Sequence, residues 1–309
     1  MTFSVTIPAF KVKYLKECIT SVLLQSYNDY EIIIVNDNSP EDIDTIVKSF
    51  DSPRIRYYKN KIGFGAEHVV DNWNKCLEYA QGDFIICMGD DDRLKTNFLA
   101  DYLSLIKKYP DLDVYYSRTE IINEHSEVIK ILEERPERES VYEMIFNRWN
   151  GGKMFIGDYL YRTEILRRQG GFFNLPYAWG SDAITAYQMA GQKGIANTKE
   201  VGFQYRVNNL TISKSTQNIK GKLDALRIER KWFESFFKQE PQNKKDNALW
   251  VWLKSHFDAH FDKMIAADII HGIKENPKKE SLKWLKQRKE YNLSRILILK
   301  CIAHGVLDF

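Results

Sequence analysis

The feature that most constrains the fold is a run of four β-branched residues, Ile32-Ile33-Ile34-Val35, near the beginning of the chain. A strand with one solvent-exposed face alternates apolar and polar residues, whereas a continuous apolar run is typical of a strand buried on both faces. Because such a strand must be covered on both sides, the run predicts a parallel sheet with helices packed on its two faces.

Strand-like and helix-like segments alternate through the first hundred residues. The expected strands are short and apolar: 4–8, 31–35, 54–58 and 83–88. Helices are expected over 14–24 and 66–80. Another helix should begin at Ser39-Pro40-Glu41-Asp42, since serine caps helices, proline suits the first helical position and an acid suits the third. Repetition at this spacing indicates βαβ units and an α/β fold.

The pattern changes twice further along the chain. Residues 110–215 contain shorter strand-like pieces among clustered glycines, and we interpret them as the second half of the same sheet with longer loops. Beyond residue 220 the chain is helix-like, Lys-rich and aromatic-rich. We therefore predict one domain over 1–215 and a helical extension over 216–309.

Charge is divided unevenly between these parts. Residues 216–309 hold 19 Lys and Arg against 12 Asp and Glu, a net charge of +7, which leaves −4 for the rest of the chain. A mildly acidic main part with a basic C-terminal part does not indicate nucleic-acid binding. It suggests a catalytic domain with an extension that binds to a surface.

Composition narrows the class of protein. With 44% apolar and 28% charged residues the chain has enough material for a buried core, and it lacks the bias of disordered segments. It has no run of eighteen apolar residues and no signal-peptide pattern after Met1. The four cysteines show no metal-ligand spacing. We expect a cytoplasmic protein with free thiols.

Small or acidic residues lie at the ends of three of the predicted strands. The first strand ends at Pro8-Ala9-Phe10, the second is followed by Asp37, and the fourth by Asp90-Asp91-Asp92. Ligands of open α/β sheets bind beyond the carboxyl ends of the strands. Three adjacent carboxylates repel one another, and a hard cation such as Mg²⁺ or Mn²⁺ would hold them together. The alternatives are a solvated acidic turn and, for Asp37, a local turn capped by Ser39.

These segments resemble glycosyltransferase family 2, which has the GT-A fold. The resemblance covers about residues 3–213, in the family's order and spacing. Its matching fragments are Val5-Thr6-Ile7-Pro8-Ala9-Phe10, Val35-Asn36-Asp37-Asn38-Ser39, Asn60 through Asn74, Ala80 through Ile85, Gly89-Asp90-Asp91-Asp92, Phe155-Ile156-Gly157, Tyr161-Arg162, Gly170-Gly171-Phe172, Trp179-Gly180-Ser181-Asp182, and Tyr205-Arg206 with Thr211 and Ser213.

The resemblance implies a Rossmann-like, mostly parallel central sheet flanked by helices and a site for a nucleotide-diphospho-sugar. Asp37 would accept a hydrogen bond from the base, commonly uracil, and Asp90 would face the ribose. Arg206 would lie near the diphosphate and the acceptor. The residues that the resemblance places at this site are Pro8, Ala9, Phe10, Asp37, Asn60, Gly63, Asn74, Asp90 and Arg206.

The resemblance also implies a metal and a catalytic base. Asp91, with Asp92 beside it, would bind Mn²⁺ or Mg²⁺, and Asp182 would be the base of an inverting transfer. From the residues alone, the favoured interpretation of Asp182 is an N-cap for a helix over 183–189. The chain departs from the commonest family pattern at five positions, which weakens inference about the donor: Asn36, Asn38, Gly89, Ser181 and Asn208.

The function we expect is transfer of a sugar from a nucleotide-diphospho-sugar, with UDP favoured, to a glycan or a lipid-linked acceptor in bacterial surface polysaccharide synthesis. A catalytically silent nucleotide-sugar-binding protein is the alternative; a nucleotidyltransferase would need a glycine-rich loop after the first strand. The basic face from Lys278 to Lys289 and the apolar residues of 295–307 could contact the inner surface of the cytoplasmic membrane, form a homodimer, or simply be solvated.

Overall fold

The structure, a computed structural model, describes residues 1–208, 218–291 and 293–307. The chain forms two compact units. The sheet unit comprises Met1–Asn174 and Ser181–Asn209, and the helical unit comprises Leu175–Gly180 and Leu210–Phe309. The predicted boundary between residues 215 and 216 lies outside the described residues, as do Thr211 and Ser213. No sequence feature predicted that the short segment 175–180 would group with the C-terminal helices.

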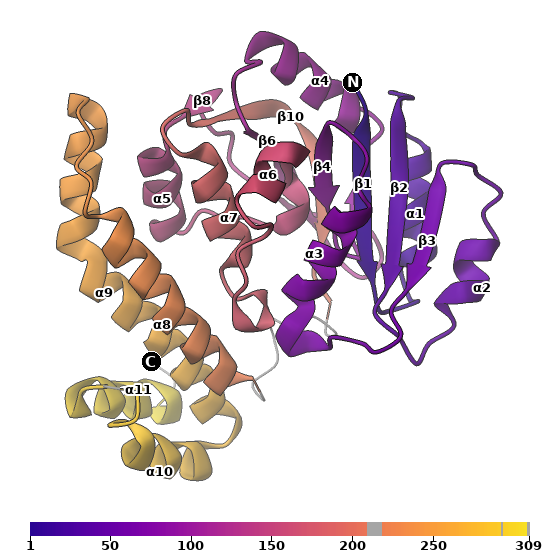
Figure 1. Ribbon diagram of the computed structural model, residues 1–309. Coiled ribbons are helices and arrows are strands. Elements are labelled where there is room, and N and C mark those ends of the chain that lie inside the picture. The colour runs from indigo at the N-terminus through magenta and orange to yellow at the C-terminus, as the bar shows by residue number, and fades with distance from the viewer. Residues whose placement is uncertain (209–217, 292, 308–309) are drawn as a thin grey trace. The chain divides into compact units, whose positions relative to one another are not determined.

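The first half of the sheet unit has the predicted alternation of strands and helices (Figure 1). Its elements are β1 (Phe3–Ala9), α1 (Leu15–Leu23), β2 (Tyr30–Asn36), α2 (Ile43–Lys48), β3 (Ile55–Lys59), η1 (Ala66–His68), α3 (Val69–Tyr79) and β4 (Phe84–Cys87). β1 lies between β2 and β4 and is parallel to both, and β3 is parallel to β2 on the outer side. The parallel sheet expected here is confirmed.

One predicted helix begins later than expected. α2 starts at Ile43, and its cap is Asp42, whose Oδ1 accepts a hydrogen bond from the Thr45 N–H at 3.0 Å. The prediction that Ser39 caps this helix was wrong. The Ser39 hydroxyl instead donates to the Phe10 carbonyl at 2.5 Å, which ties the end of β2 to the end of β1.

The second half of the sheet unit mixes parallel and antiparallel pairs. Its elements are β5 (Arg93–Leu94), α4 (Phe98–Lys108), β6 (Val114–Ile122), β7 (Val128–Ile131), β8 (Arg138–Glu139), α5 (Val141–Trp149), η2 (Ile156–Asp158), β9 (Tyr159–Arg162), α6 (Thr163–Arg168), α7 (Ser181–Ala190) and β10 (Ile195–Arg206). The strand order is β3-β2-β1-β4-β9-β6-β10-β5. β6 and β10 are parallel, whereas β9 runs antiparallel to both of its neighbours, β4 and β6.

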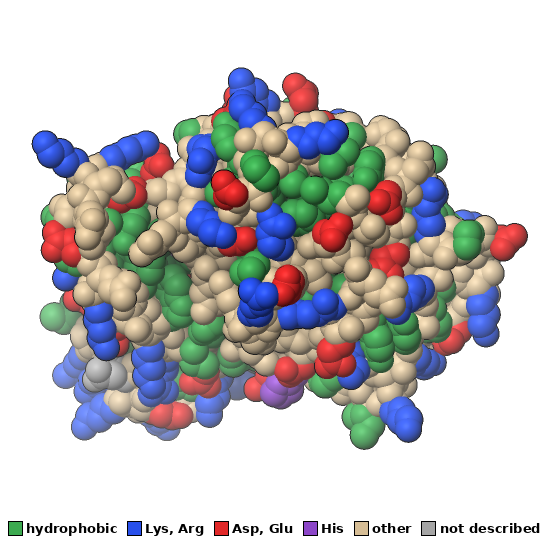
Figure 2. Space-filling model, turned by 45° about the horizontal axis from the view of Figure 1, so that its top comes forward, with side chains coloured by type: hydrophobic (Ala, Val, Ile, Leu, Met, Phe, Trp, Pro, Cys, Tyr) green, Lys and Arg blue, Asp and Glu red, His purple; other side chains and the backbone are tan. Residues whose placement is uncertain are grey.

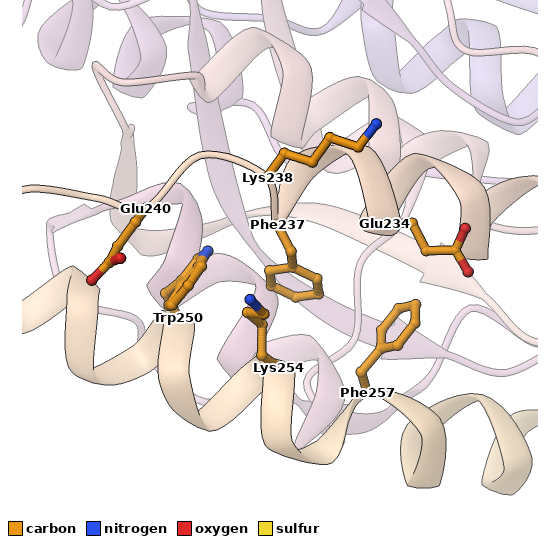
Figure 3. Close-up of a pocket in the computed structure, with 7 residues that line it drawn as sticks. All are labelled: Glu234, Phe237, Lys238, Glu240, Trp250, Lys254 and Phe257. Atoms are coloured by element: carbon orange, nitrogen blue, oxygen red, sulfur yellow. The ribbon is translucent and has the colours of Figure 1, made fainter.

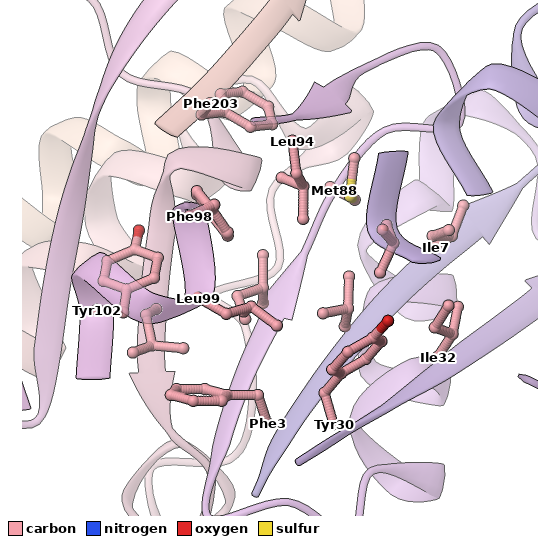
Figure 4. Packing of buried hydrophobic residues seen from close by; sticks show 14 of the residues in the cluster. Phe3, Ile7, Tyr30, Ile32, Met88, Leu94, Phe98, Leu99, Tyr102 and Phe203 are labelled. Carbon is pink, nitrogen blue, oxygen red and sulfur yellow. The ribbon is translucent and has the colours of Figure 1, made fainter. Parts of the chain in front are cut away.

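The core of the sheet unit packs one face of the first strands against α1 and α4 (Figure 4). Phe3 and Ile7 of β1 and Ile32 of β2 are fully buried, and Leu99 and Tyr102 of α4 are fully buried in the same cluster. Each such side chain stabilises the fold by about 1.5–3 kcal/mol through its burial. This packing fixes the positions at which β1, β2 and β4 end.

The helical unit is built around two aromatic-rich helices. Its elements are η3 (Pro176–Ala178), α8 (Ile219–Phe236), α9 (Lys244–Glu275), α10 (Pro277–Gln287) and α11 (Arg295–Leu307). Phe233 of α8 is fully buried, and its ring contacts those of Phe237 and Phe261 edge-on or stacked. In the described part of the chain, no helix is both long and apolar enough to cross a membrane.

Charged side chains of both signs are interspersed over the face of the molecule shown in Figure 2. In this view blue side chains are most numerous at the lower left, with fewer red ones among them.

Candidate active site

The ends of β2, β1 and β4 are joined by hydrogen bonds at one edge of the sheet. The Asp37 N–H donates to the Ala9 carbonyl at 3.0 Å, which links β2 to β1. The Phe10 and Lys11 N–H groups both donate to Asp90 Oδ2 at 2.7 Å, which links β1 to β4. β1 pairs with strands on both sides here, and such a switch point is where α/β sheets bind ligands.

Asp90 is a buried carboxylate. Burial raises its pKa to about 6, the charge of Asp91 contributes to the rise, and the two backbone N–H groups oppose it. Because Oδ2 already accepts two hydrogen bonds, this oxygen holds the β1 end against the β4 end. Asp90, predicted to face a ribose, thus has one structural oxygen and only its second oxygen left for a ligand.

Asp37 organises the loop that follows β3. Its Oδ1 accepts from the Asn60 side-chain amide at 3.0 Å and from the Phe64 N–H at 2.8 Å, and its Oδ2 accepts from the Gly65 N–H at 2.9 Å. Gly63 packs so closely on the Asp37 carbonyl that a Cβ there would overlap it. Three predicted site residues, Asp37, Asn60 and Gly63, therefore form one loop anchor.

Two carboxylate oxygens lie beside Gly89. A Cβ at residue 89 would lie 2.9 Å from Asp92 Oδ2 and 3.0 Å from Asp91 Oδ1, so the glycine makes room for both side chains. Asp91 Oδ2 accepts from the Asn208 amide at 2.7 Å, and Asp92 Oδ1 accepts from a backbone N–H at 2.9 Å. Burial and the neighbouring Asp91 charge raise the pKa of Asp92 well above its ordinary value.

Arg206 is fully buried, and each nitrogen of its guanidinium has a protein partner. Nε donates to the Asp91 carbonyl at 2.7 Å, and Nη2 donates to Glu17 Oε2 at 2.8 Å. Nη1 donates to the Asn123 carbonyl at 3.0 Å and to Ser126 Oγ at 2.9 Å. The predicted site residue Arg206 thus joins α1, the β6–β7 turn and the Asp91 backbone.

The other residues predicted to bind the nucleotide differ in their exposure and in their contacts. Ala9 is buried in β1, Pro8 is partly buried, and Phe10 is 43% exposed and available to a ligand. The side chain of Asn74 binds the backbone next to Gly171. Its Oδ1 accepts a hydrogen bond from the Phe172 N–H at 2.8 Å. Asn74 therefore braces α3 against residues 171–172.

Asp182 lies in the first turn of α7, where its Oδ1 accepts from the Ala183 N–H at 2.8 Å. Burial raises its pKa, and the positive charge of Arg148 opposes the rise. Its charge also raises the pKa values of buried Asp158 and Tyr161. Asp182 is thus a carboxylate at a helix start whose proton affinity is increased.

Comparison with known protein families settles the class of protein. The family model described as Glycosyl transferase family 2 matches residues 4–172, which is more than half of the chain. The chain belongs to glycosyltransferase family 2. It is therefore a member of an enzyme family, and the sheet that the sequence predicted is the GT-A sheet of this glycosyltransferase.

Individual relatives agree with the family. A Rickettsia typhi protein named an uncharacterized glycosyltransferase is 25% identical over 72% of this chain and 69% of its own length. The Escherichia coli UDP-Glc:alpha-D-GlcNAc-diphosphoundecaprenol beta-1,3-glucosyltransferase WfgD is 30% identical over 42% of this chain, and the match spans half of that relative. The crystal structure of S. aureus TarS 1-349 with UDP-GlcNAc superposes with a TM-score of 0.66 at 16% identity, covering 99% of this chain and 82% of TarS, which shows the shared fold.

Two charged residues that contact or lie close to the candidate site residues were not predicted from the sequence. Glu17 pairs with Arg206, and Asp158 is fully buried where it accepts from Thr119 Oγ1 at 3.1 Å. Glu17 lies on a helix face with no local signal, since its partner is 189 positions away. Asp158 follows directly on the matched Phe155-Ile156-Gly157 fragment, and this position could have singled it out.

A cavity of about 470 Å³ lies within the helical unit of the glycosyltransferase (Figure 3). Its lining combines aromatic and charged side chains: Glu234, Phe237, Lys238, Glu240, Trp250, Lys254 and Phe257. Lys254 Nζ lies 4.1 Å from the Trp250 ring centroid and covers part of this lining. None of the predicted site residues lines this cavity.

Proposed function

We propose that this glycosyltransferase transfers a sugar from a UDP-sugar to a hydroxyl group of a glycan or lipid-linked acceptor in the synthesis of a bacterial surface polysaccharide. The transfer inverts the anomeric configuration. Two similar proteins support this choice by their names alone, since WfgD uses UDP-Glc on a diphosphoundecaprenol acceptor and TarS was crystallised with UDP-GlcNAc.

The observation that carries the proposal is the convergence of Asp37, Phe10 and Asp90–Asp92 at the ends of β2, β1 and β4. The hydrogen bonds among these residues hold them at one switch point of the sheet. The exposed Phe10 ring offers a face on which a base can stack, and the Asp37 N–H is bonded to the carbonyl of Ala9, the residue before Phe10. A nucleotide is a ligand that matches this combination of aromatic face and polar backbone.

The carboxylates of Asp91 and Asp92 fit a hard divalent cation. Asp91 Oδ1 and Asp92 Oδ2 flank the same point beside Gly89. Within residues 1–208, 218–291 and 293–307, no group of three or more His, Cys, Asp or Glu side chains is placed to hold a metal ion. Mg²⁺ and Mn²⁺ sites of this kind take one or two carboxylates, with substrate phosphates as further ligands. When bound, the ion supplies charge neutralisation to the leaving diphosphate.

The residues of the chain perform the other parts of the reaction. Asp182 accepts the proton of the acceptor hydroxyl while the hydroxyl oxygen forms a bond to the anomeric carbon. The bond from that carbon to the diphosphate oxygen breaks on the opposite face, and UDP leaves. Arg206 holds the Asp91 backbone in place through its 2.7 Å hydrogen bond, so that the carboxylate keeps its position during the displacement.

Donor binding tests the proposal. UDP-sugars, GDP-sugars and dTDP-sugars are compared by thermal shift with and without Mn²⁺, and donor hydrolysis is measured in parallel. We expect UDP-sugars to raise the melting temperature in the presence of Mn²⁺. Asp91→Ala is expected to remove the Mn²⁺-dependent part of the shift, because it deletes a carboxylate that flanks Gly89.

The matched control is Asp111→Ala, at an exposed aspartate. A shift that Asp91→Ala and Asp111→Ala leave equally intact would contradict the metal assignment. Stabilisation by a UDP-sugar without hydrolysis or transfer to any acceptor would instead favour a silent nucleotide-sugar-binding protein.

The helical unit carries a surface suited to an anionic membrane. Exposed apolar side chains lie on α10 and α11: Leu282, Ile296, Leu299, Val306 and Leu307. Exposed lysines accompany them on α10, including Lys279 and Lys286. Each lysine near an anionic surface contributes about 1 kcal/mol of attraction. A lipid-linked acceptor would be presented at such a surface, and we propose that the protein acts at the inner face of the cytoplasmic membrane.

Sedimentation with lipid vesicles checks this contact. We expect the protein to bind vesicles that contain anionic phosphatidylglycerol, to bind neutral phosphatidylcholine vesicles weakly, and to be released by salt. Lys279→Glu/Lys286→Glu should reduce binding, whereas Lys231→Glu/Lys238→Glu, a matched pair of exposed lysines on and just after α8, should reduce it less. Equal loss in both pairs, or a dimer in light scattering that these charges do not affect, would contradict the proposal.

A further inference from the structure

The segment that precedes Asp182 is bound by α8 of the helical unit. We call this segment, residues 175–180, the strap; it groups with the C-terminal helices, although the residues on both sides of it belong to the sheet unit. The strap contains η3 and ends at Gly180, and α7 begins at the next residue, Ser181. The conformation of the strap therefore sets where the helix that carries Asp182 begins.

Gly221 of α8 provides the space for the strap. A Cβ at this position would overlap the ring of Tyr177, so the ring packs directly on the helix backbone. Glycine in the middle of a helix is unfavourable relative to alanine, and its presence indicates a close approach by another group. Here the group that approaches is the Tyr177 ring.

Lys222, the next residue of α8, makes the second contact. Its side chain is buried, with only 2% exposed, and its Nζ lies 4.3 Å from the centroid of the Trp179 ring. A buried ammonium over an indole face is held by the cation–π attraction. A third contact follows on α8, since a Cβ at Gly180 would lie 3.0 Å from Glu229 Oε2.

The strap backbone is in a conformation that needs such support. Tyr177 and Ala178 have φ values of 58° and 53°, and Gly180 has a φ of 95°. Two consecutive non-glycine residues in the left-handed region are strained and persist only where surrounding contacts hold them. Contacts with Gly221, Lys222 and Glu229 are the contacts of this kind that α8 supplies.

We propose that Gly221 and Lys222 are positioning residues for the catalytic base: by holding the strap, α8 fixes the start of α7 and thereby the place of Asp182. This inference rests on the proposed role of Asp182. It assigns to the helical unit a part in the chemical step, which the composition of a basic extension does not predict.

Gly221→Ala in the full-length protein tests the proposal. The added methyl group stabilises α8 as a helix but displaces Tyr177. We expect faster hydrogen–deuterium exchange in peptides covering 175–182 and a fall in kcat of about 10- to 100-fold, because misplaced catalytic groups lose rate on this scale. The thermal shift caused by the UDP-sugar should not change.

Lys222→Met is the second variant and keeps the test decisive if Gly221→Ala fails to fold. Methionine retains most of the apolar stem and removes the ammonium, so kcat should fall by about 2- to 30-fold through loss of the cation–π contact. The matched controls are Gly272→Ala, whose methyl would meet Ile219 rather than the strap, and Lys220→Met, at a lysine whose side chain is 70% exposed.

The outcomes separate the two proposals. Unchanged exchange at 175–182 in both variants, or faster exchange with kcat within about twofold of the controls, would overturn the positioning role. A wild-type enzyme that transfers sugar to no acceptor would overturn the proposed function instead. In that case the exchange rates would still decide whether α8 holds the strap.

Discussion

Replacing Asp182 by asparagine is expected to reduce sugar transfer by about 10²- to 10⁴-fold, the range that a positioned general base contributes. The amide oxygen of asparagine can still accept the hydrogen bond that the Ala183 N–H now donates to Oδ1, so the start of α7 should be preserved. Donor binding should be unchanged, because the strand-end carboxylates are untouched. The measurements are kcat for transfer and the UDP-sugar-dependent thermal shift.

A matched control for this substitution is Asp101→Asn. Asp101 also lies in the first turn of a helix, α4, and burial also raises its pKa. It has no place in the proposed chemistry, so its variant should transfer sugar at the wild-type rate. Turnover by Asp182→Asn that equals turnover by Asp101→Asn would show that Asp182 only stabilises the first turn of its helix.

The pH dependence of the wild-type enzyme follows from the direction of the Asp182 shift. A general base must be deprotonated, and burial raises the pKa of Asp182, so kcat/KM should rise with pH through a pKa above that of an exposed aspartate. Arg148 lowers this pKa, and Arg148→Gln should move the rise to higher pH. The raised pKa also means that the folded state holds this proton more tightly than the unfolded state, so Asp182 destabilises the fold as pH increases through that range, and Asp182→Asn should remove this loss.

The sequence was sufficient for the first half of the sheet because its signals are local. The run Ile32–Val35 needs no distant partner to identify a strand buried on both faces, and β2 covers it in the structure. The second half was less predictable. β9 is only four residues long, and its antiparallel direction between β4 and β6 depends on pairing partners far away in the chain. Short strands of this kind carry too few residues for periodicity to indicate direction.

The side chains of the candidate site were also hard to predict, because their contacts depend on partners far away in the chain. The structure places Asp37 and Asp90 at the ends of β2 and β4, where each is hydrogen-bonded to the end of β1. Their individual hydrogen bonds, to the loop after β3 and to the β1 end, could not be inferred, because each depends on backbone N–H directions that only the folded loops define. The packing of residues 175–180 on α8 could not be predicted from the sequence either, because it depends on the absence of a side chain at Gly221.

Arg206→Met is expected to destabilise the sheet unit strongly. The guanidinium is fully buried and donates to Glu17, to the Asp91 carbonyl and to the β6–β7 turn. Each buried carbonyl that loses its donor costs about 1–3 kcal/mol, whereas Glu17, whose side chain is 36% exposed, is partly solvated and contributes less. We expect the free energy of unfolding, measured by urea denaturation, to fall by about 2–4 kcal/mol in total.

Comparing the stability lost in Arg206→Met with that lost in Arg93→Met tests whether Arg206 stabilises the fold through its buried hydrogen bonds. Arg93 pairs with the same carboxylate, Glu17, at 2.8 Å, but its side chain is 31% exposed, so its loss should cost no more than about 1 kcal/mol. If the free energy of unfolding fell by the same amount in the two variants, the proposed role of Arg206 in holding the fold together would be contradicted. Arg206→Lys separates this role from donor recognition, because lysine keeps the charge but cannot reproduce the fork of hydrogen bonds. If Arg206 acts by holding Asp91, Arg206→Lys should lose stability without donor present; if it contacts the diphosphate, the variant should lose donor affinity at unchanged stability.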